Sequence, residues 1–206
     1  MKRYIGGFAA VLAAVVVSAC STGSVSSGTA SPVASSSIEQ TAPTRPTLTK
    51  PALQPPAQEG QYVNKDRPDV LFDPCTWIKD ETIREAGFDP ATRNRGQDFI
   101  AEWTFLVCEF RSETITLSVM SGNVTLEEET KKNGSWQRPI TVNGRDATIG
   151  REPERGDSCT VNIRTAVGVV FVDQLLNLQG RIQGTDPCVD IEKTAALIEQ
   201  EIGEGN

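Results

Sequence analysis

The chain has 206 residues and a formal net charge of −7, a length that favours one domain with appendages and a charge that argues against nucleic-acid binding, which needs a basic footprint. The same negative charge argues against a polybasic attachment to anionic lipid. The sequence contains no histidine, which excludes Ser-His-Asp and Cys-His catalysis and makes a zinc enzyme unusual.

The N-terminus has the pattern of an export signal. Lys2 and Arg3 form a short positive region, and residues 4–19 form an apolar run that is shorter than the roughly 20 residues of a membrane-spanning helix. Residues 1–19 are therefore predicted to be a signal peptide. Its removal would lower the net charge from −7 to about −9, because two lysine and arginine charges would be lost. An ordinary signal without lipidation and an uncleaved anchor are the alternatives.

The apolar run ends at Val17-Ser18-Ala19-Cys20, which resembles the lipobox of bacterial lipoproteins. Five cysteines leave one unpaired in an oxidising compartment, and acylation of Cys20, for example with palmitate, leaves four that can pair. Two or more acyl chains would anchor the chain stably in a membrane. We therefore expect a lipid on Cys20 and a location in the cell envelope, at the outer face of the cytoplasmic membrane.

Residues 20–67 form a tether that is rich in Ser, Thr and Pro and poor in aromatic residues. Such a stretch buries too little apolar surface to offset the entropy of ordering it, and it is predicted to be disordered. The globular domain is then predicted to span residues 68–206, a size that supports one hydrophobic core.

The domain is expected to begin and end with a helix. Asp73 can cap a helix over residues 74–86, which Gly87 would end, and Asp186 can cap a second one over residues 187–202. In both places a proline in the first turn follows the aspartate, as is typical of helix starts.

Between the two helices the apolar residues alternate with a period of two, as in half-buried strands. An Asn143-Gly144 turn is the strongest hairpin signal in the chain. A short helix is expected from a cap at Asn123 to Lys131. The expected strands span residues 103–108, 114–119, 136–142, 147–150, 159–165 and 169–176. We therefore predict an α+β fold with an antiparallel sheet of about five to six strands and both terminal helices on one side.

The four remaining cysteines allow three pairings. We favour Cys75–Cys108 and Cys159–Cys188, because each pair joins a helix start to a strand nearby in sequence. Each closed loop of about thirty residues would contribute about 3–4 kcal/mol on the loop-entropy description. No Cys-x-x-Cys motif is present, so we expect no redox or metal site and no cofactor.

Three segments of the domain resemble a known family: Leu71–Ile78, Arg84–Phe88 and Thr104–Phe110. They are similar to actinobacterial lipoproteins with a C-terminal domain of unknown function that opens with Asp-Pro-Cys, including the mycobacterial Lpr-type lipoproteins. The resemblance implies a cell-envelope lipoprotein of a Gram-positive organism. It implies no activity and no catalytic residues.

Candidate ligand-binding residues are few. Trp136 is the tryptophan expected to be most exposed, and Arg138 and Arg145 belong to an arginine-rich C-terminal half that could pair with carboxylate or phosphate groups. Ordinary surface ion pairs are the alternative. The acidic run Glu127-Glu128-Glu129 could bind a hard cation but equally suits the first turn of a helix.

Together these features predict a non-catalytic binding or sensing module for an envelope partner, which could be a protein, a glycan or a lipid. The alternative is a hydrolase or transferase that uses carboxylates or a Ser-Lys pair, for which the sequence offers no nucleophile motif. We therefore assign no catalytic residue.

Overall fold

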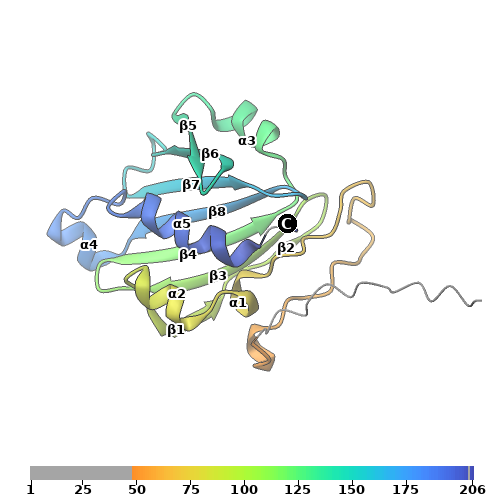
Figure 1. Cartoon of the computed structure of the whole chain (residues 1–206), viewed down its shortest axis with the longest axis horizontal. Coiled ribbons are helices and arrows are strands. Elements are labelled where there is room, and N and C mark those ends of the chain that lie inside the picture. Colours follow the sequence, from red (N-terminus) through yellow and green to blue (C-terminus); the bar gives the residue numbers. More distant parts are fainter. Residues whose placement is uncertain (1–47, 204) are drawn as a thin grey trace, which may run out of the picture. The chain divides into compact units, whose positions relative to one another are not determined.

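The computed structural model describes residues 48–203 and 205–206. The predicted signal peptide, the lipidation site Cys20 and the first part of the predicted tether lie outside these residues. Within the described range an antiparallel sheet carries helices on both faces (Figure 1).

The sheet has eight strands in the described part of the chain, in the order β1-β3-β4-β8-β7-β6-β5, with β2 paired to β3. This confirms the predicted α+β class and antiparallel sheet, but the predicted count of five to six strands was too low. The strands are β1 Asp89–Arg95, β2 Phe99–Ile100, β3 Thr104–Arg111, β4 Ile115–Gly122, β5 Gln137–Val142, β6 Arg145–Gly150, β7 Ser158–Arg164 and β8 Val169–Leu176.

The two strands that the sequence did not predict lie at one edge of the sheet. β1 reads Asp-Pro-Ala-Thr-Arg-Asn-Arg, with a proline and no apolar alternation. Edge strands tolerate both features, because they need no second hydrogen-bonding partner and present side chains to solvent. β2 has only two residues, too few for any period to show.

The main core lies on one face of the sheet. Strands β3 and β4 bury every second residue, including Cys108 and Val119, and β8 contributes Val170 and Val172 to the same side. Helix α5, Ile191–Ile202, covers this face with Ala195 and Ile198 fully buried. Ile78 and Ile83, from the N-terminal helical segment, belong to the same core cluster.

The N-terminal helix is broken into two. α1 spans Pro74–Trp77 and α2 spans Asp80–Glu85, and the backbone between them is extended. The predicted cap at Asp73 is confirmed, because its carboxylate accepts from the backbone N of Thr76 at 2.8 Å. The break lets α1 stay beside β3 while Thr82 of α2 donates to Glu201 of α5 at 2.5 Å.

The C-terminal helix begins later than predicted. Residues 187–190 form a turn, and α5 starts at Ile191. The Asp186 carboxylate accepts from the backbone N of Cys188 at 2.9 Å, so it closes this turn and does not cap a helix. The short helix α3, Leu126–Asn133, is capped by Thr125 in a capping box with Glu128, not by Asn123. A further helix, α4 Leu178–Gln183, was not predicted.

Leu53 and Arg67 of the predicted tether contact the domain. Leu53, in the short 3-10 helix η1 Pro51–Leu53, joins the core and is 6% exposed. Its carbonyl accepts two bonds from Arg95, at 2.6 and 3.1 Å. Arg67 forms a two-pronged pair with Glu128 at 2.6 and 3.1 Å. These contacts join residues before position 68 to the domain.

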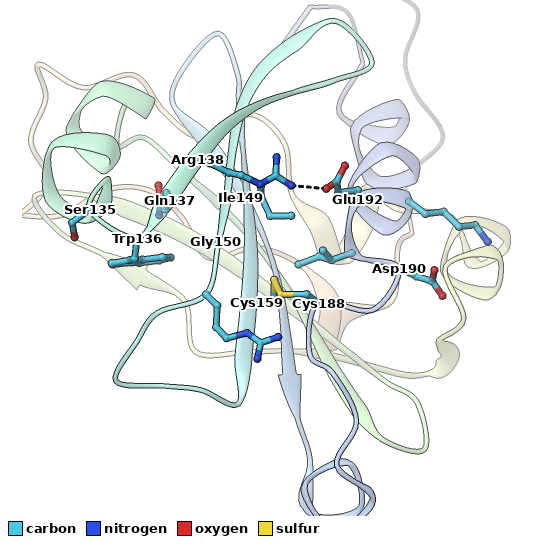
Figure 2. A pocket seen from close by; sticks show the side chains of 13 residues that line it. Ser135, Trp136, Gln137, Arg138, Ile149, Gly150, Cys159, Cys188, Asp190 and Glu192 are labelled. Carbon is cyan, nitrogen blue, oxygen red and sulfur yellow. Dashed lines mark hydrogen bonds and ion pairs between the residues drawn. A yellow bond between two sulfur atoms is a disulfide. The ribbon is translucent and has the colours of Figure 1, made fainter.

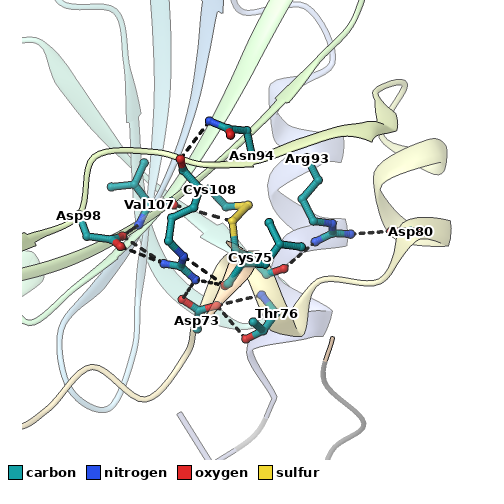
Figure 3. Close-up of a disulfide and its surroundings, with 11 residues drawn as sticks. Asp73, Cys75, Thr76, Asp80, Arg93, Asn94, Asp98, Val107 and Cys108 are labelled. Atoms are coloured by element: carbon teal, nitrogen blue, oxygen red, sulfur yellow. Dashed lines mark hydrogen bonds and ion pairs between the residues drawn. A yellow bond between two sulfur atoms is a disulfide. The ribbon is translucent and has the colours of Figure 1, made fainter. Parts of the chain in front are cut away.

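Both predicted disulfides are present, Cys75–Cys108 and Cys159–Cys188. Figure 3 shows the first one, which joins α1 to β3 next to a cluster of polar side chains. In this cluster Arg95 bonds Asp73 at 2.6 Å and Asp98 at 3.1 Å. Because all three side chains are nearly buried, the cluster fixes the edge strand β1 to the start of the domain.

Candidate functional site

The face of the sheet opposite α5 is only partly covered. Helix α3 packs on one end of it through Leu126, which contacts Val169 and Phe171 of β8. Beside this contact Trp103, Phe105, Met120, Val124 and Phe171 line a hollow of about 730 Å³ with the polar side chains of α3. The rings of Phe105 and Phe171 lie 6.2 Å apart. This hollow forms an apolar end of the uncovered face.

A row of polar residues crosses the sheet beyond the apolar end. The strand registers place the row's members opposite one another on β3, β4, β8, β7, β6 and β5. In that order they are Glu109, Ser118, Asp173, Thr160, Gly150 and Gln137. Because the side chains of neighbouring strands at one register point to the same face, the row forms a polar floor.

Every member of the polar floor except Gln137 lines a second hollow of about 560 Å³. This hollow is walled by α3, Trp136 and the loop between β6 and β7. Four residues, Met120, Glu129, Lys132 and Phe171, line both hollows. The two hollows therefore adjoin, and we call them together the open-face groove. Each has a volume typical of a small-molecule site.

A chain of side-chain hydrogen bonds holds α3 over the groove. The nearly buried carboxylate of Glu129 accepts from Asn133 at 2.7 Å and from Gln137 at 3.1 Å. The hydroxyl of Thr148 donates to Gln137 at 2.9 Å, and Asn162 donates to Thr148 at 3.1 Å. This network extends from α3 across three strands, so the wall of the groove is tied to its floor.

The carboxyl group of Asp173, on the polar floor of the groove, has a raised pKa. Desolvation raises the pKa of its carboxyl group to about 6, and the negative charge of Glu129 acts in the same direction. A hydrogen bond with Thr160 and the positive charge of Arg155 oppose this rise. A carboxyl group with such a pKa changes its charge near neutral pH, where an exposed aspartate stays ionised.

Trp136 stands between the groove and a neighbouring hollow of about 750 Å³, because it lines both. Figure 2 shows this neighbouring hollow beside the Cys159–Cys188 disulfide, between β5, β6 and the start of α5. Trp136 is half-buried, and its ring lies against Gly150. Trp77 and Trp103 are half-buried too, so burial class does not distinguish Trp136 from the other two tryptophans.

The two candidate arginines lie apart. Arg138 lines the hollow beside the disulfide and pairs with Glu192 at 3.0 Å, with both side chains more than 60% exposed. Arg145 bonds Glu199 at 2.6 Å and the carbonyl oxygens of Gly203 and Asn206. Arg145 thus fastens the end of the chain, and the structure does not bring it to the site of Trp136 and Arg138.

The acidic run at the start of α3 is divided among three surroundings. Glu127 pairs with Arg164 at 2.6 Å, Glu128 pairs with Arg67, and Glu129 faces the groove. Arg67 lowers the pKa of Glu128 to about 2, chiefly through its hydrogen bonds. The three carboxylates do not converge on one point, and no cluster of metal-ligating residues occurs within residues 48–203 and 205–206.

Sequence reasoning missed the acids on the sheet floor. Asp173 and Gln174 interrupt the apolar run of β8, Val-Val-Phe-Val-Asp-Gln-Leu-Leu, and this interruption was the available signal. Glu109 follows the alternation of β3 and reads as an ordinary outward-facing residue. Only the pairing of distant strands places the two acids in one row.

The comparison with protein families gives one result. A family described as "Protein of unknown function (DUF3558)" matches residues 15–201. The chain belongs to this family. Searches of curated proteins and of solved structures found no match. Among the helices of the described residues, none has the length and apolar character to cross a membrane.

Proposed function

We propose that this DUF3558 protein is a cell-envelope lipoprotein whose domain is a non-catalytic binding or sensing module. The observation that carries the proposal is the open-face groove, in which an apolar hollow and a polar floor adjoin. Binding sites are typically concave and largely apolar, with a few polar groups that orient the ligand. The envelope location rests on the signal pattern and on Cys20, in keeping with the Lpr-type lipoproteins that the sequence resembles.

The groove hypothesis is tested by ligand capture. The chain from residue 20 onward, with Cys20→Ser to keep it soluble, is incubated with a native envelope extract, and bound lipids, glycans and proteins are identified by mass spectrometry. We expect a specific compound that is lost with Met120→Gln in the groove and retained with Leu178→Gln. Leu178 is 75% exposed on α4 and serves as the matched control. If Met120→Gln captures the same compound as the wild-type chain, the proposal is contradicted.

The lipid anchor is tested in cells. Cys20→Ala should move the protein from the membrane fraction to the soluble fraction and stop incorporation of labelled fatty acid. Ser21→Ala, one residue later, is the matched control and should change neither property. Continued membrane attachment of Cys20→Ala would show that the lipid is not the anchor.

A second candidate function is a carboxylate-based envelope hydrolase or transferase. It is favoured by one observation, the raised pKa of Asp173 in a hollow that Glu109 and Glu129 also line. An acid with a pKa near the working pH suits general acid–base chemistry. If this candidate is right, an envelope extract is turned over by the wild-type chain and not by Asp173→Asn.

A further inference from the structure

The occupant of the groove can be narrowed by the chemistry of its two halves. This inference rests on the proposed function, because it names the ligand of that same site. The apolar half offers the side chains of Trp103, Phe105, Met120, Val124 and Phe171. Such a lining contains few hydrogen-bonding groups at its centre and suits a hydrocarbon chain.

The polar half favours a head group that donates hydrogen bonds. Strand residues on its floor include the acids Glu109 and Asp173 and the neutral Ser118, Thr160 and Asn162. No lysine or arginine from a strand lines this half among the described residues, and the bases of its lining, Lys132 and Arg155, come from α3 and a loop and are exposed. A carboxylate accepts hydrogen bonds and repels anions, so the floor disfavours phosphate head groups.

Trp136 adds an aromatic surface at the edge of the polar half. Its ring lies against Gly150, the member of the polar row on β6, and it is half-buried. An aromatic face beside hydrogen-bond acceptors matches a sugar, which has an apolar C–H face and a rim of hydroxyl groups.

We propose that the open-face groove binds an acylated neutral sugar, with the acyl chain in the apolar half beside Met120 and Phe171 and the sugar on the polar floor around Asp173. The hydroxyl groups donate to Glu109 and Asp173, and the sugar ring packs near Trp136. The proposal involves recognition only and no change in covalent bonds.

The test uses four probes: maltose, and the amphiphiles dodecyl maltoside, dodecyl phosphate and lauric acid, each amphiphile below its critical micelle concentration. Binding to the Cys20→Ser chain from residue 20 onward is measured by titration calorimetry. This chain retains both apolar clusters, which begin at Leu53, and both disulfides. We expect saturable binding of dodecyl maltoside, and at least tenfold weaker binding of each of the other three probes.

Two pairs of variants locate the site. Met120→Gln should weaken dodecyl maltoside binding at least tenfold, whereas Leu178→Gln on α4 should leave it unchanged. Asp173→Asn should narrow the preference for dodecyl maltoside over dodecyl phosphate, because it removes a negative charge from the floor. Glu154→Gln, an exposed acid outside the groove lining, should leave the preference intact.

The outcomes separate this inference from the proposed function. Equal or tighter binding of dodecyl phosphate or lauric acid, still sensitive to Met120→Gln, would overturn the sugar assignment and leave a groove that binds ligands. Equal binding of maltose and dodecyl maltoside would overturn the acyl-chain assignment. If no probe binds, and Met120→Gln does not change what is captured from the envelope extract, both the inference and the assignment of the groove as the functional site are wrong.

Discussion

The ring of Trp136 lies so close to Gly150 that a Cβ at Gly150 would come within 2.8 Å of the ring and 2.5 Å of the Trp136 carbonyl oxygen. Only a residue without a side chain lets β6 pass beneath this ring. The contact ties the segment between α3 and β5 to the sheet, and Trp136 in turn separates the groove from the hollow beside the second disulfide.

Gly150→Ala is therefore expected to displace Trp136. Overpacking of this kind costs about 1–3 kcal/mol, and we expect a lower unfolding free energy and a changed tryptophan fluorescence spectrum. Gly156→Ala is the control, because a Cβ there has no neighbour within 4 Å. Unchanged stability and fluorescence of Gly150→Ala would show that the ring does not rest on the strand in solution.

Arg95→Met is expected to release the N-terminal segment of the domain. The change removes two bonds to the Leu53 carbonyl and leaves the buried carboxylates of Asp73 and Asp98 without their arginine. Loss of one partner from a buried ion pair costs about 3–5 kcal/mol. Hydrogen exchange should speed up at Leu53 and Gln54 before it does so in the central strands.

The exposed Arg111 at the end of β3 supplies the comparison for Arg95. Arg111→Met should leave exchange at Leu53 at the wild-type rate. If both variants exchange alike at this residue, Arg95 does not hold the segment in place.

The two disulfides should differ in how readily a reductant reaches them. Cys75 and Cys108 are fully buried, whereas Cys188 is partly exposed in the hollow that Figure 2 shows. A small thiol at low concentration, followed by alkylation and peptide mapping, should label Cys159 and Cys188 first. Equal labelling of all four cysteines would mean that reduction follows global unfolding.

Loss of either disulfide should also lower the melting temperature. The loops span sequence separations of 33 and 29 residues, for which loop entropy predicts about 3–4 kcal/mol each. The double variants Cys75→Ala/Cys108→Ala and Cys159→Ala/Cys188→Ala avoid unpaired thiols. A melting temperature unchanged from wild type would show that the disulfide concerned does not stabilise the domain.

The stability of the domain should depend on the ionisation of Asp173. Its pKa is about 6 in the folded protein and 3.8 when unperturbed, so the folded state binds more protons between these values. The stability that depends on protonation of Asp173 is therefore present in full below about pH 4. It is lost as the pH rises through about 6.

Asp173→Asn removes this dependence. We expect the variant to be more stable than wild type at pH 7, by about 1–2 kcal/mol after allowance for solvent access to the groove, with a smaller difference at pH 4. Urea unfolding at both pH values measures the effect, and Glu154→Gln is the control. A variant whose stability differs from wild type by the same amount at both pH values would show that the pKa of Asp173 is not raised in the folded protein.

Several parts of the fold followed from local sequence. The Asn143-Gly144 turn has positive φ at both residues and joins β5 to β6, as its composition requires. Alternation and the Asn143-Gly144 turn identified the six strands β3 to β8, and in β3 and β4 every second residue is buried in the core. The disulfide pairing was predicted correctly because each bond joins two elements that are neighbours in the fold and close in sequence. Asp73 caps α1 through a contact only three residues away.

The groove and the contacts of residues 48–67 depend on tertiary structure. These residues lack apolar periodicity, yet Leu53 lies in the core and its carbonyl accepts hydrogen bonds from Arg95, which is distant in sequence. The helical segment after Asp73 divides into α1, next to β3, and α2, which bonds α5. Glu109 and Asp173 share a row because β3, β4 and β8 pair in that order. The local sequence predicts strands from the alternation of apolar residues, and it predicts turns and helix caps. The order of strands in a sheet arises from contacts between distant segments.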